Sequence, residues 1–152
     1  MKYRTEITIA LPLQEFIRKL DNPENMKHWQ RGLTGYQILS GEAGREGTKM
    51  ELHYTMGKRK LVLIETIIKR NLPHEFHATY DAPGVHNLQR NYFEEIDAQT
   101  TRWTAETEFE FSGFFMRLMA LVMPGSFKKQ SRKYAEDFKA FAEKGVSVAD
   151  DK

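Results

Sequence analysis

The chain has 152 residues, which suffices for one domain with a real hydrophobic core and excludes most modular enzymes. Its 23 Lys and Arg residues against 21 Asp and Glu leave a formal net charge of +2, so nucleic-acid binding is not expected. The absence of cysteine excludes disulfides, thiolate metal sites and cysteine nucleophiles, and it is typical of a reducing compartment. The N-terminal residues alternate polar and apolar side chains and lack the apolar stretch of an export signal, so we expect a cytoplasmic protein.

Residues 2–10 predict a strand, because apolar or hydroxyl-bearing side chains recur there at every second position. A short amphipathic helix follows Pro12 and ends near Asp21. Its apolar positions recur at helical spacing: Leu13, Phe16, Ile17 and Leu20. The tripeptide Asn22-Pro23-Glu24 combines an N-cap side chain with a proline and predicts a second short helix that ends before Gly32.

From Thr34 to Ser112 the pattern changes to six strands, which we expect to pair antiparallel because no helical period separates them. The predicted turns lie at residues 41–47, 57–59, 71–73, 82–84 and 97–100. The clearest strand runs from Trp103 to Phe111, where apolar or small side chains alternate with Thr104 and three glutamates. One face of the sheet is therefore expected to be apolar and the other solvated.

The C-terminal part, from Gly113 to Lys144, has a helical pattern that Pro124-Gly125 interrupts, and we expect Ser126 to cap the last helix. An aromatic stripe on that helix consists of Phe127, Tyr134, Phe138 and Phe141. The apolar segment before it, 114–119, is expected to close one end of the core. Its Phe and Met residues are also typical of adaptable membrane-facing surfaces, so a transient membrane contact is the alternative.

This order of elements predicts an α+β fold in which a curved seven-stranded antiparallel sheet holds the long helix against its concave face, while two short helices close one end. At this point the chain resembles the START-like, or SRPBCC, superfamily, whose members have the helix-grip fold. The resemblance covers residues 1–144. It is carried by the opening strand with Leu11-Pro12, by Asn22-Pro23-Glu24 with Trp29, by the hairpin region from Ser40-Gly41-Glu42 to Gly47-Thr48, and by the closing helix from Arg132 to Lys144.

The resemblance implies one START-like domain over residues 1–145, and residues 146–152 are expected to form a flexible C-terminal tail. Superfamily members include lipid-transfer domains, polyketide cyclases and aromatases, and birch-pollen-allergen-like proteins. The chain is most similar to bacterial single-domain members of the cyclase/dehydrase and lipid-transport type. These motifs specify a fold and no particular chemistry.

A hollow between the sheet and the last helix is the expected binding site. Apolar-inward alternation predicts the side chains on its wall, which are Met50, Leu52, Tyr54, Met56, Phe76, Tyr80, Gln89, Asn91, Phe93, Trp103, Thr107, Phe109, Phe127, Tyr134 and Phe138. The register that places Phe93 inside avoids burying Arg90. Residues 61–68 are apolar on both faces, so the pattern does not decide whether Glu65 faces the hollow.

Neither a metal nor a cofactor is expected. The acidic and histidine-rich residues between His74 and His86 are interpreted as surface strand residues, because His74 and His77 are an odd number of positions apart and point to opposite faces. The glycines of residues 41–47 recur as in a phosphate loop, but no helix follows them and two glutamates would repel an anion. A hairpin turn is the favoured interpretation.

Three functions remain open after these observations. The favoured one is binding, with possible transport or sensing, of a small hydrophobic or lipid-like ligand in the internal cavity. The first alternative is a cyclase/aromatase or dehydrase in the same cavity, for which Tyr54, Tyr80, Tyr134 and Glu65 are the candidate proton-transfer groups. The second is a protein-interaction module with a filled core. The sequence indicates neither the ligand nor the oligomeric state.

Overall fold

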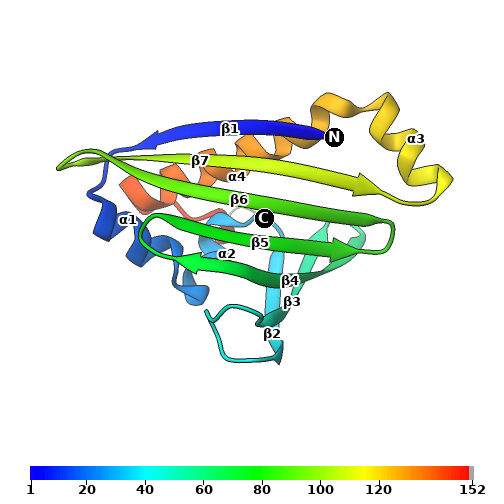
Figure 1. Ribbon diagram of the computed structural model, residues 1–152, viewed down its shortest axis with the longest axis horizontal. Coiled ribbons are helices and arrows are strands. Elements are labelled where there is room, and N and C mark those ends of the chain that lie inside the picture. The colour runs from blue at the N-terminus through cyan, green and yellow to red at the C-terminus, as the bar shows by residue number, and fades with distance from the viewer. Residues whose placement is uncertain (151–152) are drawn as a thin grey trace.

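The computed structural model shows a seven-stranded antiparallel sheet curved around one long helix (Figure 1). It describes residues 1–150, apart from the side chains of Phe115, Pro124 and Asp150. The strands are β1 (Lys2–Ile9), β2 (Leu33–Ser40), β3 (Lys49–Met56), β4 (Arg59–Asn71), β5 (Glu75–Ala82), β6 (Val85–Asp97) and β7 (Thr100–Phe111). The helices are α1 (Leu13–Leu20), α2 (Met26–Trp29), α3 (Phe114–Val122) and α4 (Pro124–Lys144), with 3₁₀ turns η1 (Pro23–Asn25) and η2 (Val148–Asp150). The predicted fold class is confirmed.

The sheet has the order β1-β7-β6-β5-β4-β3-β2. Strands β2 to β7 form a meander, because each turn is too short for a crossover and forces the next strand to pair antiparallel. Strand β1 then joins the far side of β7 and places Ile7 opposite Trp103. The expected turn at residues 41–47 is the connection between β2 and β3, so the hairpin interpretation of these glycines is confirmed.

Helix α4 packs its aromatic stripe on the concave face, as the spacing predicts. Phe138 is fully buried, and its ring centroid lies 5.3 Å from that of Phe16 and 5.6 Å from that of Trp103. Nearer the start of the helix, the rings of Phe127 and Phe109 lie 5.1 Å apart. The helix is therefore held against the sheet at both ends of the stripe.

Two expectations about the C-terminal part are wrong. Helix α4 begins at Pro124, and Ser126 lies inside it, where its hydroxyl donates to the carbonyl oxygen of Met123 at 2.9 Å. Proline starts a helix well because its missing N–H would have no acceptor in the first turn.

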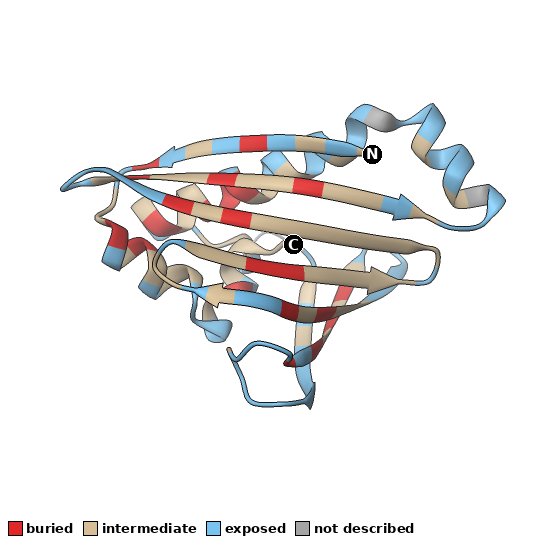
Figure 2. Cartoon of the chain, in the orientation of Figure 1, coloured by how far each residue is buried: buried red, intermediate tan, exposed pale blue. Residues whose placement is uncertain are grey.

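The segment at 114–119 does not close the core: as α3 it projects beyond the end of β7 and is mostly exposed (Figure 2). Phe114 is 83% exposed and Leu121 79%.

A β-bulge in β4 changes which side chains reach the concave face. Ile67 pairs with Ala78, but Lys69 pairs with His77, so Ile68 is the extra residue. Before the bulge the odd-numbered residues face inward, and after it the even-numbered Arg70 does. The bulge thus brings a cation to the rim of the interior.

The residues after α4 pack on the rest of the domain, since Ser147 Oγ lies 2.8 Å from Nδ1 of His28. Flexibility of the segment 146–152 stays a prediction, and its last two residues lie outside the described part. In the described residues, no helix is long and apolar enough to cross a membrane.

Candidate functional site

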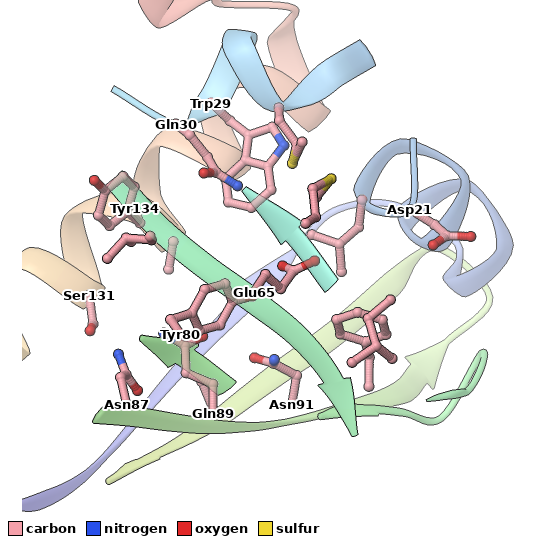
Figure 3. A pocket seen from close by; sticks show the side chains of 18 of the residues that line it. Asp21, Trp29, Gln30, Glu65, Tyr80, Asn87, Gln89, Asn91, Ser131 and Tyr134 are labelled. Atoms are coloured by element: carbon pink, nitrogen blue, oxygen red, sulfur yellow. The ribbon is translucent and has the colours of Figure 1, made fainter. Parts of the chain in front are cut away.

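A cavity of about 440 Å³ lies between the concave face of the sheet and helices α1, α2 and α4 (Figure 3). All but two of the side chains predicted on its wall line it: Met50, Tyr54, Met56, Phe76, Tyr80, Gln89, Asn91, Phe93, Trp103, Thr107, Phe109, Phe127 and Tyr134. The two exceptions, Leu52 and Phe138, face inward but are packed into the core and do not reach the cavity. Neighbouring side chains cover Leu52 and Phe138, so neither is part of the cavity wall.

A row of three amides crosses the cavity wall on β6. Asn87, Gln89 and Asn91 alternate along the strand and point into the cavity (Figure 3). The Oδ1 atom of Asn91 accepts a hydrogen bond from Nε1 of Trp103 at 2.9 Å, which fixes both side chains. Within the described residues, Oδ1 of Asn87 is buried and has no partner. A buried polar atom in that position favours a polar group on whatever fills the cavity.

Glu65 and Tyr80 form the acidic centre of the site. They are cross-strand neighbours on β4 and β5, so the Tyr80 hydroxyl and the Glu65 carboxyl group face the cavity side by side. Glu65 is only 9% exposed, and burial raises its pKa above the ordinary value. Burial, followed by the adjacent Glu65, raises the pKa of Tyr80 as well. The pair therefore combines a carboxyl group that is readily protonated with a phenol that stays protonated.

Two further tyrosines close the cavity from the helical side. The Tyr54 hydroxyl donates to Oε1 of Gln30 at 2.5 Å, and burial raises the pKa of Tyr54. Tyr134 on α4 also has a raised pKa because of burial. Neither phenol is ionised at neutral pH, so both offer hydroxyl groups and no charge.

One ion pair closes the rim where the bulge in β4 meets the end of α1. The guanidinium of Arg70 donates to both carboxylate oxygens of Asp21, at 2.8 and 2.6 Å. The backbone N–H of Arg70 also donates to Glu46, at 2.9 Å. Arg70 is the one cation among the described residues that line the cavity, and its charge is committed to Asp21.

The cavity opens where its lining residues are also exposed. Met56 and Leu61, on either side of the β3–β4 turn, line it and are 41% and 39% exposed. The same holds for Tyr36 and Ile38 on the edge strand β2. Access to solvent is thus on the β2 and β3 side, away from β1.

Sequence reasoning missed several polar lining residues. Asn87 has the same parity as Gln89 and Asn91, so extending that register by two positions identifies it. Gln130 and Ser131 lie three and four positions after Phe127, so the helical period identifies them. Gln30 follows the end of α2 in an extended conformation, and no pattern in the sequence indicates its position.

The histidine-rich stretch lies on and beside the outer face of β5 and β6. His77 is buried rather than a surface residue, because it is hydrogen-bonded to Glu75 at 2.9 Å and packed against Tyr92. His86 forms an ion pair with Asp81. Among the described residues, no group of three acidic or histidine side chains is placed to hold one metal ion.

Comparison with known proteins gives matches among solved structures alone. No protein-family model matches the chain, and no curated protein sequence matches it. A conserved protein from Geobacillus kaustophilus superposes with a TM-score of 0.78 at 14% identity, over 93% of this chain and 95% of that one. The Zhui aromatase/cyclase from Streptomyces sp. R1128 gives 0.71 at 11% identity, over 97% and 99%. A norcoclaurine synthase of Thalictrum flavum, bound to a transition-state analogue, gives 0.69 at 12% identity, over 93% of each chain.

These likenesses, together with the sheet order and the position of α4, define the fold. The chain has the START-like, or SRPBCC, helix-grip fold. The resemblance seen in the sequence is therefore confirmed at the level of the fold. At identities this low, the matches carry no information about which ligand or reaction the cavity serves.

Proposed function

We propose that the protein binds a small, uncharged, mainly hydrophobic molecule in the cavity between the sheet and α4. The observation that carries this proposal is the cavity wall itself: aromatic and aliphatic side chains surround a row of amides and the Glu65–Tyr80 pair. Its volume of about 440 Å³ lies within the range of small-molecule sites, roughly 300–1,000 Å³. Apolar walls bury the body of such a ligand, and the polar groups orient it.

The charges around the cavity favour a neutral ligand over a carboxylate. Arg70 is already paired with Asp21, so a bound carboxylate would lack a cation partner. It would also be desolvated without compensation. A hydroxyl or carbonyl group, by contrast, finds donors and acceptors in Asn87, Gln89 and Tyr80. We therefore expect alcohols and ketones to bind in preference to fatty acids.

Matched ligand pairs test this proposal. Dodecanol should bind more tightly than dodecanoate, and naphthol more tightly than naphthoate, by about tenfold or more, which corresponds to about 1.4 kcal/mol. Binding is measured by displacement of an apolar fluorescent probe and by native mass spectrometry. Asn87→Leu should weaken alcohol binding by about 0.5–1.5 kcal/mol, because one hydrogen bond is lost. Gln37→Leu, at an exposed position on β2, is the control and should change nothing.

Two results would contradict the proposal. Equal or tighter binding of the carboxylates would show that the charge argument is wrong. If none of the four ligands and no apolar probe binds saturably, the cavity is not a binding site, and the interaction-module alternative is favoured instead.

A cyclase or dehydrase function is the second candidate, and the pairing of Glu65 with Tyr80 across β4 and β5 in the cavity wall favours it. The sequence shows no paired proton-transfer groups, but a carboxyl group whose pKa is raised by burial, next to a phenol in a mainly apolar cavity, supports this candidate. Two proteins of the same fold are described as an aromatase/cyclase and a norcoclaurine synthase. If the chain catalyses such a reaction, Tyr80→Phe should slow turnover by about 10²–10⁴-fold while binding persists. Absence of turnover in the native protein favours the binder.

We place this function in the cytoplasm, since a chain without cysteine needs no oxidising compartment for its stability. The proposed partner is the small ligand, without a metal or a nucleic acid.

A further inference from the structure

Helix α3 presents its apolar face to solvent, which is the reverse of the usual arrangement. The exposed side chains recur at the spacing of one helix face: Phe114, Leu118, Leu121 and Val122. The opposite side holds the helix to the sheet, where Met116 packs against Gly84 in the β5–β6 turn. A Cβ at Gly84 would lie 2.9 Å from Cγ of Met116, so this contact is close. The exposed stripe is therefore a fixed feature of the surface.

Within the segment that carries this stripe, the charges are of one sign. Residues 112–135 contain five Lys or Arg and no Asp or Glu, in a chain whose net charge is only +2. Lys128, Lys129 and Arg132 lie in the first turns of α4, are exposed, and have no ion-pair partner among the described residues. They lie on the side of α4 opposite Phe127 and Tyr134, which face the cavity. An apolar stripe flanked by uncompensated cations is the pattern of a helix that lies at a membrane interface.

A second acid-free basic segment lies at the same end of the sheet. The β3–β4 turn and the first residues of β4 carry Lys58, Arg59 and Lys60, all exposed. Val85 pairs with Phe111, and Ile64 pairs with Asp81. The start of β4 and the end of β7 therefore lie at the same end of the sheet. Met56 and Leu61, beside this turn, belong to the opening of the cavity. The basic and apolar surface thus adjoins the entrance.

We propose that this end of the molecule docks reversibly on an anionic lipid bilayer, with the α3 stripe inserted among the lipids and the basic residues of α4 and the β3–β4 turn near the headgroups. The nine residues of α3 measure roughly 14 Å, less than half of the roughly 30 Å hydrocarbon core, so the helix lies in the interface. Docking rests on exposed residues and not on ligand binding. Its purpose, delivery of a membrane-dissolved ligand to the cavity entrance, rests on the proposed function.

Vesicle flotation with the full chain tests the docking. The protein should float with phosphatidylcholine vesicles that contain phosphatidylglycerol, more weakly with phosphatidylcholine alone, and less as salt rises. Leu121→Asp should reduce the partition coefficient by about tenfold or more, because a charge replaces an inserted apolar group. The double variant K128E/K129E should abolish the preference for anionic vesicles. Val146→Asp, at another exposed apolar position beyond the far end of α4, is the matched control and should bind as the native chain does.

Three results would overturn the proposal. The native protein fails to float with anionic vesicles at low salt, or Leu121→Asp floats as well as the control, or the native chain forms a dimer that Leu121→Asp dissociates while vesicles stay unbound. The last result assigns the stripe to a second copy of the chain. Circular dichroism and unfolding of each variant verify that it is folded. Failure of docking with intact alcohol binding would leave the proposed function standing, and the reverse result would leave the docking surface standing.

Discussion

Glu65 is the residue whose position matters most and which the sequence does not place. Residues 61–68 are apolar on both faces, because the outer face of β4 carries exposed Val62 and Ile68. Alternation separates the two faces only where one of them is polar. The structure resolves the ambiguity through pairing: Glu65 lies opposite Met50 on β3 and opposite Tyr80 on β5, and both of these face the cavity.

Burial of Glu65 predicts a specific dependence of stability on pH. Its folded-state pKa is raised above the ordinary value of 4.5, so the unfolded chain releases this proton at lower pH than the folded chain does. Below pH 4.5 the raised pKa of Glu65 makes its full favourable contribution to the free energy of unfolding. This contribution is lost as the pH rises from there through the raised folded-state pKa. We therefore expect Glu65→Gln to gain stability relative to the native chain as pH increases across this window, as measured by urea unfolding.

The difference between the two unfolding curves isolates Glu65 from the other titrating groups. Glu94→Gln, at an exposed position on the outer face of β6, is the control and should show no such trend. If the free-energy difference between native and Glu65→Gln proteins stays constant across pH, Glu65 does not have a raised pKa.

At the scale of the element, α4 has two functions along one stripe. Phe138, near its C-terminal part, is fully buried among Phe16, Trp29 and Trp103. Phe127, near its start, is half-buried, touches Phe109, and lines the cavity. The same type of side chain therefore stabilises the fold at one position and shapes the site at the other.

This division predicts different costs for the same substitution. Phe138→Ala should lower the free energy of unfolding by about 3–5 kcal/mol, because it removes a packed ring and leaves a void. Phe127→Ala should cost less, about 1–2 kcal/mol, since part of its ring already faces the cavity. Urea unfolding with a constant m-value measures both. Equal losses would show that the cavity end of α4 is packed as tightly as the core.

The elements themselves were largely predictable, since each turn and each amphipathic stretch has a local signal. The strand boundaries follow from turn chemistry at positions such as Pro83-Gly84, and the helical stripe follows from spacing. Ser126 was misplaced because Pro124 supplies a competing helix start. Exposure of α3 was not predictable, because an apolar segment by itself does not show what covers it. The side chain of Arg70 faces inward because of a β-bulge, and no pattern in the sequence indicates that bulge.

At the scale of the whole molecule, residues of two hydrophobic clusters line the cavity. One cluster contains Phe16, Phe93 and Phe138 and joins α1 and α4 to the β6–β7 side of the sheet. The smaller one contains Met26, Leu52 and Tyr54 and joins α2 to β3. Strand β2 beyond it is an edge strand, largely exposed, with two irregularities in its register. We therefore expect the β2–β3 side to open more easily than the β6–β7 side.

A ligand in the cavity should stabilise that half most. Any molecule that binds only the folded state adds stability, about 2.7 kcal/mol at a hundredfold excess over Kd. Since the ligand would touch Met50 and Tyr54 on one side and Trp103 on the other, it would link the two clusters. We expect amide hydrogen exchange in β2 and β3 to slow markedly when dodecanol is added. Exchange in β6 and β7 should change little, under conditions in which amides exchange through local opening of the native protein and not through global unfolding.

Two variants distinguish an effect of the ligand in the cavity from an effect at the docking surface. Leu121→Asp changes a residue outside both clusters, so its exchange pattern with dodecanol in the absence of lipid should match that of the native chain. Asn87→Leu, by contrast, should require more dodecanol to reach the same protection in β2 and β3. Uniform slowing over all seven strands would mean that the sheet opens as one unit, and that the cavity does not divide the domain into halves of different stability.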